Sequence, residues 1–317
     1  MGSQIKIPVL DFTEKNLKPG SDSWVLACEK IRYGLEEYGC FEMVYDNDDK
    51  VPLQLYNSIF SAAQDLFDLP IETKKKKVSD RPGCGYIGQI PIIPLYESME
   101  VDNPTTFQNV EYFTNTMWPQ GNEIFRESVL SFSKPVVELY EMATRMVFDS
   151  FGIGRYHRSH MESTSYGLRF FKFRTRQTND TEVGVPIHTD KTFITLLKQN
   201  QVDGLQIRTK DNHDHYVDVK PNFSSIMFIA GDALMAWSNG KIRACEHRVM
   251  VKEEEKAARY SIGLFSFVNG VMHIPEELVD DEWPLQYKPF DHFHFLRFYF
   301  MEGGTASACP IKDYCAV

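Results

Sequence analysis

Apolar residues recur with helical spacing through the first half of the chain and with strand spacing through much of the second. Runs whose apolar positions lie three and four residues apart predict three helices, over residues 24–38, 56–67 and 122–151. Pro135 falls inside the third run and predicts a kink or a junction between two helices. The alternating segment 40–45 predicts a short strand, and the stretch 84–96, with its glycines and prolines, predicts an ordered loop.

The pattern changes near residue 165. From Tyr166 to Val268 the chain divides into runs of five to eight residues rich in Phe, Ile, Val and Thr, separated by turn signals such as Asn239-Gly240. This spacing indicates an antiparallel sandwich or barrel. A last run, residues 291–300, has helical spacing. We therefore expect a mainly β, α+β chain that forms one compact unit, in which a helical region wraps a β core with a C-terminal helix. The two regions span residues 1–160 and 161–317.

Composition and charge exclude several classes of protein. Of the 317 residues 43% are hydrophobic and 25% charged, as in a globular protein with a buried core. The net charge of −10 argues against a nucleic-acid partner, because phosphate binding needs a basic surface. The basic run 74–77 fits a solvated helix end. We find no signal peptide, no lipidation motif and no transmembrane run, and the six cysteines include no CxxC pair. We expect a cytoplasmic monomer that acts on a small molecule without a membrane partner.

A possible metal site lies in the β region, in the segment Pro186-Ile187-His188-Thr189-Asp190. Residues i and i+2 of a strand point to the same face, so His188 and Asp190 present an imidazole and a carboxylate together. A second histidine, His247, follows after 56 intervening residues. Two histidines and one carboxylate leave open positions on a metal, which is the arrangement of non-haem Fe(II) oxygenases.

Two other histidine pairs compete for this role. His213 and His215 lie in a strongly polar turn and fit a solvated loop between strands. His292 and His294 lie two residues apart in the predicted C-terminal helix, where they do not share a face. Neither pair is expected to chelate a metal.

An anion-binding pair follows the second metal-ligating histidine. Arg259 and Ser261 come 12 and 14 residues after His247 and point to one face of the next strand. A guanidinium fork and a hydroxyl on one face form a carboxylate receptor. Such a receptor can hold the far carboxylate of a co-substrate whose near end chelates the metal.

The order HxD, His, RxS resembles the signature of the Fe(II)- and 2-oxoglutarate-dependent dioxygenases, in particular the plant soluble branch. Other family-like segments extend this similarity over nearly the whole chain: Ile7-Pro8-Val9-Leu10-Asp11-Phe12, Tyr38-Gly39-Cys40-Phe41, Gly204-Leu205-Gln206, Ser238-Asn239-Gly240 and Glu246-His247-Arg248-Val249. Three further segments are similar to the AOP-like clade, which includes glucosinolate side-chain and steroidal-alkaloid dioxygenases: Gly88-Gln89-Ile90-Pro91, Thr116-Met117-Trp118-Pro119 and Leu234-Met235-Ala236-Trp237.

The resemblance implies a double-stranded β-helix, a cupin-like jelly roll, with Fe(II) held by His188, Asp190 and His247. It also implies 2-oxoglutarate as co-substrate, held by Arg259 and Ser261, together with dioxygen, and ascorbate as reductant. Oxidation of a C–H bond would accompany release of succinate and CO2. Because related halogenases lack the carboxylate, the presence of Asp190 favours hydroxylation, and demethylation, desaturation or ring closure are open alternatives.

The chain departs from the family at Phe173. Relatives often place there a tyrosine whose hydroxyl contacts 2-oxoglutarate, so we expect co-substrate binding to be weakened or to use another donor. Aromatic and apolar side chains are expected to hold the substrate: Tyr86, Ile90, Phe113, Phe265, Phe267 and Phe295.

Several functions remain open at this stage. A small apolar plant specialised metabolite is the first candidate substrate, and a hormone such as auxin or gibberellin is the alternative. A hormone acid would need a further basic residue, for which Arg169, Lys172 and Arg174 are the nearby candidates. The other classes are a jelly-roll binding protein without oxygenase activity and a zinc hydrolase.

Overall fold

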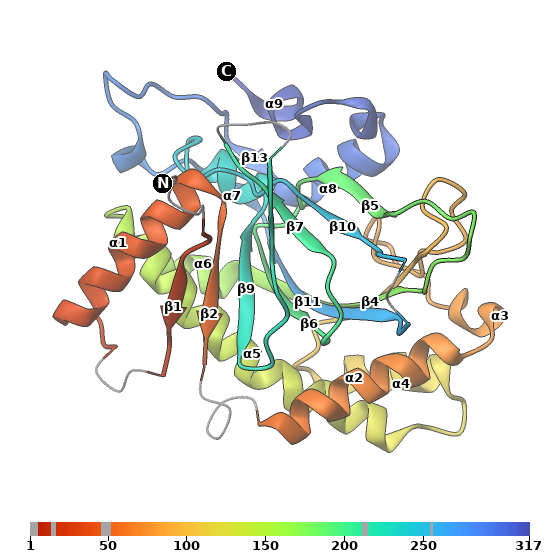
Figure 1. Ribbon diagram of the computed structural model, residues 1–317. Helices are drawn as coiled ribbons and strands as arrows, with labels where there is room; N and C mark the ends of the chain where they lie inside the picture. Colours follow the sequence, from red (N-terminus) through yellow and green to blue (C-terminus); the bar gives the residue numbers. More distant parts are fainter. Residues whose placement is uncertain (1–5, 14–16, 46–51, 211–214, 254–255) are drawn as a thin grey trace.

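Two β-sheets and a layer of helices make up the computed structural model, which describes residues 6–13, 17–45, 52–210, 215–253 and 256–317 (Figure 1). The larger sheet has the spatial order β1 (Val9–Asp11), β2 (Cys40–Val44), β9 (Ser225–Ala230), β6 (Ile194–Gln199), β11 (Arg259–Val268), β4 (Thr164–Phe173) and β3 (Tyr96–Asp102). The smaller sheet has the order β5 (Val183–His188), β10 (His247–Met250), β7 (Leu205–Arg208) and β8 (Tyr216–Asp218). A separate pair is formed by β12 (Val271–Met272) and β13 (Phe290–Asp291).

The predicted helices are present with nearly the expected ends. They correspond to α1 (Asp22–Glu37), α2 (Leu53–Asp68), α5 (Glu123–Ser150) and α8 (His292–Met301). The structure adds α3 (Ile71–Lys74), α4 (Phe107–Met117), α6 (His157–Ser163), α7 (Asp232–Trp237) and α9 (Pro310–Cys315). Of the two alternatives expected at Pro135, a kink or a junction between helices, the junction is wrong, because α5 continues through this residue. In the described part of the chain, no helix is both long and apolar enough to cross a membrane.

Two strands of the larger sheet were not expected from the pattern. Strand β1 has only three residues, too few to show alternation. Strand β3 directs Ser98 and Glu100 to a buried face, so its polar positions hide the binary pattern of a half-buried strand. Both strands belong to the predicted helical region, and β3 pairs with β4 over its full length. We therefore propose that the two regions of the chain fold together as one unit.

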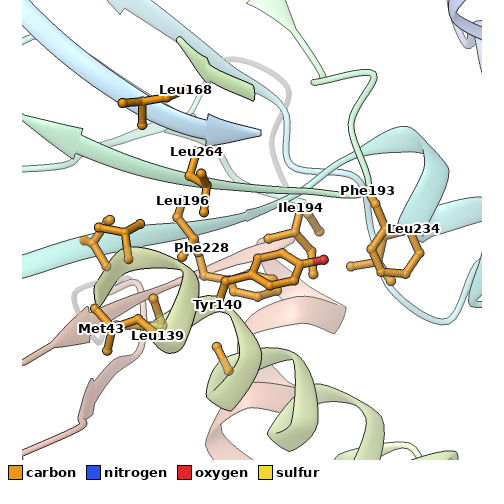
Figure 2. Packing of buried hydrophobic residues seen from close by; sticks show 14 of the residues in the cluster. Met43, Leu139, Tyr140, Leu168, Phe193, Ile194, Leu196, Phe228, Leu234 and Leu264 are labelled. Carbon is orange, nitrogen blue, oxygen red and sulfur yellow. The ribbon is translucent and has the colours of Figure 1, made fainter. Parts of the chain in front are cut away.

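The outer face of the larger sheet packs against helix α5. Because side chains alternate along a strand, Ile194 and Leu196 of β6 point to this face together with Leu264 of β11. They meet Leu139 and Tyr140 of α5 in a buried cluster (Figure 2). The opposite face of the same strands is thereby left for the cavity between the sheets.

One cation lies within this apolar layer. Lys198 of β6 is fully buried, and its Nζ donates hydrogen bonds to the carbonyl oxygens of Asn222, Phe223 and Ser225 at 3.2, 2.8 and 2.6 Å. The rings of Tyr45 and Tyr56 flank the ammonium, with centroids 5.0 and 5.2 Å away. The ammonium thus joins β6 to the turn that begins β9.

Replacing Lys198 with methionine keeps the length of the side chain but removes the donor for three carbonyls. We expect the free energy of unfolding to fall by roughly 2–4 kcal/mol, measured by urea denaturation. Lys252→Met is the control, because this exposed ammonium lies 4.0 Å from Asp203, and its cost should be below about 0.5 kcal/mol. Equal costs for the two variants would contradict a structural role for Lys198.

Candidate metal and co-substrate site

The HxD segment and His247 come together at one end of the paired strands β5 and β10. Strands β5 and β10 pair so that His188 and His247 are direct cross-strand partners, with ring centroids 4.2 Å apart. Asp190 follows β5 and directs Oδ1 to within 3.9 Å of Nε2 of each histidine. One ligand atom from each residue lies within 4.8 Å of the other two. Among the described residues, this is the group whose geometry could hold a metal ion.

Hydrogen bonds orient all three side chains toward one point. The Nδ1 atoms of His188 and His247 lie 2.9 and 3.0 Å from the carbonyl oxygens of Pro186 and Cys245. Since a carbonyl only accepts, each Nδ1 carries a proton and each Nε2 is left free to bind a metal. Thr195 donates to Asp190 Oδ2 at 2.7 Å, which leaves Oδ1 facing the histidines. The donor set fits an ion such as Fe(II).

The electrostatics of this group also favour a cation. Burial, together with the neighbouring imidazole, lowers the pKa of His188 to about 4. Burial also opposes protonation of His247, but Cys245 and the Asp190 carboxylate raise the pKa of His247 to about 9. Asp190 therefore attracts positive charge to the space between the two rings, and a divalent ion supplies that charge.

Hydrogen bonds from Asp232 and His292 hold the backbone of the loop that carries Asp190. The backbone N–H of Asp232 donates to the Asp190 carbonyl at 2.8 Å, and Lys191 Nζ lies 2.6 Å from Asp232 Oδ2. His292, at the start of α8, lies with Nε2 2.8 Å from the Lys191 carbonyl and accepts the Val268 N–H at Nδ1, 3.1 Å. These contacts assign a neutral His292 with its proton on Nε2. The sequence predicted that His292 does not chelate, and the structure gives it this bracing position.

A second polar group lies further along the same cavity. Arg259 and Ser261 begin β11, are 2% and 3% exposed, and face the cavity as predicted. Arg259 donates to Gln199 Oε1 at 2.7 Å and to Ser261 Oγ at 3.3 Å, while its Nε has no hydrogen-bond partner within the described residues. Burial lowers the pKa of Arg259 to about 10, and only Asp203 raises it. A buried guanidinium without a paired carboxylate needs an anion, so the site fits a carboxylate ligand.

Gln199 was missed by the sequence reasoning. It is the cross-strand partner of Ser261 in the β6–β11 pairing, which places its amide beside the guanidinium of Arg259. The available signal was the parity of β6: Thr195, which binds Asp190, and Gln199 lie an even number of residues apart and so share the cavity face.

Phe173 lies directly beside the polar group formed by Arg259 and Ser261. It is the cross-strand partner of Arg259, and the guanidinium carbon lies 5.3 Å from its ring centroid. Its other neighbour is Tyr96 of β3, whose ring centroid is 5.5 Å away. Phe173 thus packs against the arginine and offers no hydroxyl to a ligand.

Both polar groups open into one cavity of about 480 Å³ between the sheets. Three of the predicted substrate residues line it: Ile90, Phe265 and Phe267. The structure places the other three away from the cavity lining. Tyr86 donates to Glu97 at 2.8 Å on the other face of β3, Phe113 stacks on Phe125, and Phe295 packs against Tyr314. Helix α8 contributes different side chains to the cavity: Leu296, Tyr299 and Phe300.

Among the described residues, neither competing histidine pair supplies a ligand to the candidate metal-binding group. His213 falls outside the described residues. In the described part of the chain, neither His215 nor His294 belongs to a group that could hold a metal.

Comparison with known proteins agrees with this geometry. Residues 164–268 match the model of the 2OG-Fe(II) oxygenase superfamily, and residues 7–111 match the N-terminal model described as non-haem dioxygenase in morphine synthesis. The chain belongs to the 2-oxoglutarate- and Fe(II)-dependent oxygenase family and is a dioxygenase of the AOP-like plant clade. Its cofactor and co-substrates are Fe(II), 2-oxoglutarate and dioxygen.

Individual relatives cover almost the whole chain. A probable 2-oxoglutarate-dependent dioxygenase of Arabidopsis thaliana, AOP1.2, is 40% identical over 98% of this chain and 96% of its own length. Among solved structures, the rice dioxygenase for auxin oxidation has a TM-score of 0.80 at 24% identity, covering 98% of this chain and 100% of that chain. The Arabidopsis thaliana dioxygenase for auxin oxidation 1, in complex with 2-oxoglutarate, has a TM-score of 0.76 at 26% identity, with coverage of 88% and 100%. The predicted jelly roll is confirmed.

His292 provides a test of the brace behind Asp190. His292→Phe removes both hydrogen bonds, so we expect metal affinity to fall by roughly 10–100-fold, measured by competition titration with a coloured chelator. His292→Gln can restore one or both bonds and should recover most of the affinity. Unchanged metal binding in the Phe variant would show that the brace is dispensable.

The same residue predicts acid sensitivity. Burial lowers the pKa of His292 to about 4 from an ordinary value of 6.5, so the folded protein favours the neutral ring. The neutral ring makes its full contribution to the free energy of unfolding above pH 6.5. This contribution falls by at most about 3 kcal/mol as the pH decreases toward 4. Between these pH values, the free energy of unfolding measured with urea should depend less steeply on pH in His292→Gln than in the wild type. An identical slope in both proteins would exclude His292 as the titrating group.

Proposed function

We propose that His188, Asp190 and His247 hold Fe(II), and that Arg259 binds the distal carboxylate of 2-oxoglutarate with help from Ser261. Bound iron supplies the dioxygen chemistry that couples loss of CO2 from 2-oxoglutarate to oxidation of a substrate C–H bond. The single observation that carries this assignment is the buried Arg259 without a paired carboxylate, which faces the cavity that the metal-binding group shares. A zinc hydrolase or a binding jelly roll would have no use for that guanidinium.

Each residue has a separate task in this proposal. The two carbonyl-bound Nδ1 atoms fix the ligand tautomers of His188 and His247. Thr195 orients the carboxylate of Asp190. Gln199 turns the fork of Arg259 toward the cavity, and the apolar wall excludes water from the reacting end.

The substrate we propose is a small, uncharged and largely apolar plant specialised metabolite. The lining beyond the two polar groups is mainly aliphatic and aromatic, with side chains of the loop before β3, of β11 and of α8. The basic residues that a hormone acid would need already have acidic partners. Arg169 pairs with Glu100, Lys172 lies 3.3 Å from Asp68, and Arg174 lies 2.6 Å from Asp180. Auxin or another hormone acid is the alternative, since two solved relatives are named for auxin oxidation.

The remaining expectations are proposals of the same kind. We propose a cytoplasmic monomer that binds no nucleic acid, supported by the net charge of −10. The position oxidised and the choice among hydroxylation, demethylation, desaturation and ring closure depend on how the substrate lies against the metal.

Loss of a metal ligand tests the proposed function. Anaerobic protein with Fe(II) and 2-oxoglutarate should show a weak visible metal-to-ligand charge-transfer band and form succinate in air. His188→Ala and Asp190→Ala should each reduce both signals to below about one hundredth, while Thr116→Ala, on α4, should change neither. Succinate formation by either ligand variant at the wild-type rate would place the metal elsewhere, and absence of both signals in the wild type would favour the non-oxygenase classes.

Arg259 tests the co-substrate site separately. Arg259→Met should raise KM for 2-oxoglutarate by roughly 10–100-fold, because charge-assisted hydrogen bonds contribute about 1.5–3 kcal/mol. Arg259→Lys keeps the charge but loses the forked pair of donors, so its KM for 2-oxoglutarate should lie between those of the wild type and Arg259→Met. The control Arg158→Met removes a surface guanidinium 90% exposed on α6. A KM equal to that of the wild type in the Met variant would refute this role.

A further inference from the structure

Two cationic side chains besides Arg259 line the cavity, and each forms an ion pair with a carboxylate. They are Arg169 of β4 and Lys191, which follows Asp190. The three ammonium donors of Lys191 are used by Asp232 Oδ2 at 2.6 Å and by the carbonyl and hydroxyl oxygens of Thr189, both at 2.9 Å. Lys191 therefore has no donor left for a ligand.

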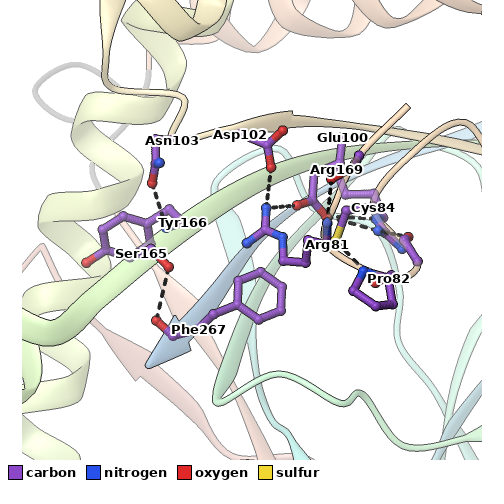
Figure 3. Close-up of polar contacts among 12 residues, drawn as sticks. Arg81, Pro82, Cys84, Glu100, Asp102, Asn103, Ser165, Tyr166, Arg169 and Phe267 are labelled. Atoms are coloured by element: carbon purple, nitrogen blue, oxygen red, sulfur yellow. Dashed lines mark hydrogen bonds and ion pairs between the residues drawn. The ribbon is translucent and has the colours of Figure 1, made fainter. Parts of the chain in front are cut away.

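Arg169 is compensated by a fully buried carboxylate. Glu100 of β3 is its direct cross-strand partner, and Glu100 Oε2 lies 3.1 Å from Nε and 3.0 Å from Nη2 of Arg169 (Figure 3). Glu100 Oε1 accepts from Arg81 Nη2 at 2.5 Å, and Arg81 also contacts Asp102 at 2.5 Å. One carboxylate thus bridges two guanidinium groups at the end of the cavity away from the co-substrate group.

Other contacts use the remaining faces of these guanidinium groups. Arg169 Nη2 also donates to the Gly83 carbonyl, which holds the loop before β3 against the sheet. The guanidinium carbons of Arg169 and Arg81 lie 5.2 and 4.3 Å from the ring centroids of Phe265 and Phe267. Burial alone would lower the pKa of Arg169, but the neighbouring acidic groups, of which Glu100 is the strongest, together raise it. Arg169 is therefore a fixed cation whose Nε and Nη2 already have partners.

This arrangement opposes a second anion. A carboxylate ligand at Arg169 would have to displace Glu100 or lie beside it in a low-dielectric wall, and like charges placed together there cost several kcal/mol. An uncharged ligand meets no such penalty. Its polar atoms can use neutral side chains of the cavity lining, such as Tyr96 and Tyr299.

We propose that Glu100 determines specificity: by occupying Arg169, it makes the substrate end of the cavity accept uncharged molecules and reject carboxylates. This inference rests on the oxygenase function proposed above, because it concerns the substrate of that site. Removing Glu100 should uncover a carboxylate receptor, and removing Arg169 should free Glu100 Oε2 for an amine, while Oε1 stays with Arg81.

Matched probes of one skeleton test this directly: phenylbutanoic acid, its primary amide, and phenylbutylamine. The measurement is the half-saturating concentration for perturbation of the Fe(II)–2-oxoglutarate charge-transfer band. Wild-type protein should bind the amide at least about tenfold more tightly than the acid. In Glu100→Gln, the preference should move toward the acid by about tenfold or more. The matched control is Glu97→Gln, the same change on the opposite face of β3, which should leave the ratio unchanged.

Arg169→Met gives the reciprocal test if the Glu100 variant does not fold. With Glu100 Oε2 freed from Arg169, the ratio of amine to amide binding should rise by about tenfold or more. Equal or tighter binding of the acid by the wild type, or an unchanged ratio in a folded Glu100→Gln protein, would overturn the proposal. Loss of the charge-transfer band and of basal succinate formation in the wild type would instead overturn the oxygenase function itself.

Discussion

The pleat of the larger sheet is the constraint on which the site depends, because each strand offers only alternate side chains to the cavity. On β11, Tyr260 and Ile262 belong to the main helix-facing core, while Arg259 and Ser261 face the cavity. A shift of one residue would exchange the two sets and bury the guanidinium against α5. Burial of the apolar face therefore sets the register, and the register positions the chemistry.

Cross-strand pairing then assembles groups that are far apart in the chain. The register of β11 with β4 and β6 places Phe173 and Gln199 on either side of the Arg259–Ser261 pair. The pairing of β5 with β10 places His188 directly opposite His247. The metal-binding half thus depends on one strand pair and the Arg259–Ser261 half on two, and the cavity lies where the two sheets face each other.

This organisation explains what the sequence could reveal. The HxD and RxS pairs were readable because the two members of each pair lie two residues apart, on one strand or directly after it, and the family resemblance supplied their roles. The partners Gln199 and Glu100 were not readable, because each meets its arginine only through the register of two strands. The same limit explains the fold: long amphipathic helices were predicted correctly, whereas β3, with its buried polar side chains, was not.

Aromatic residues show a second limit, since ring size indicates burial but not direction. Tyr86 was expected at the substrate because it lies among glycines in a loop. Its hydroxyl instead meets Glu97, which Lys74 also contacts at 2.5 Å, on the face of β3 opposite the cavity. Phe113 and Phe295 have ordinary core surroundings. Only the strand residues, whose parity is fixed, could be placed by pattern alone.

The charges of the cavity divide it into two chemically different ends. At one end Arg259 is buried without a paired carboxylate, and at the other Arg169 is paired with Glu100, which also contacts Arg81. Phe173 belongs to the first end, where its ring packs against the guanidinium and adds a cation–π contact of about 0.5–2 kcal/mol. The Phe173 ring offers no donor to a ligand but helps to orient the arginine. In the function proposed above, 2-oxoglutarate binds at the Arg259 end, and the Arg169 end is left for an uncharged substrate.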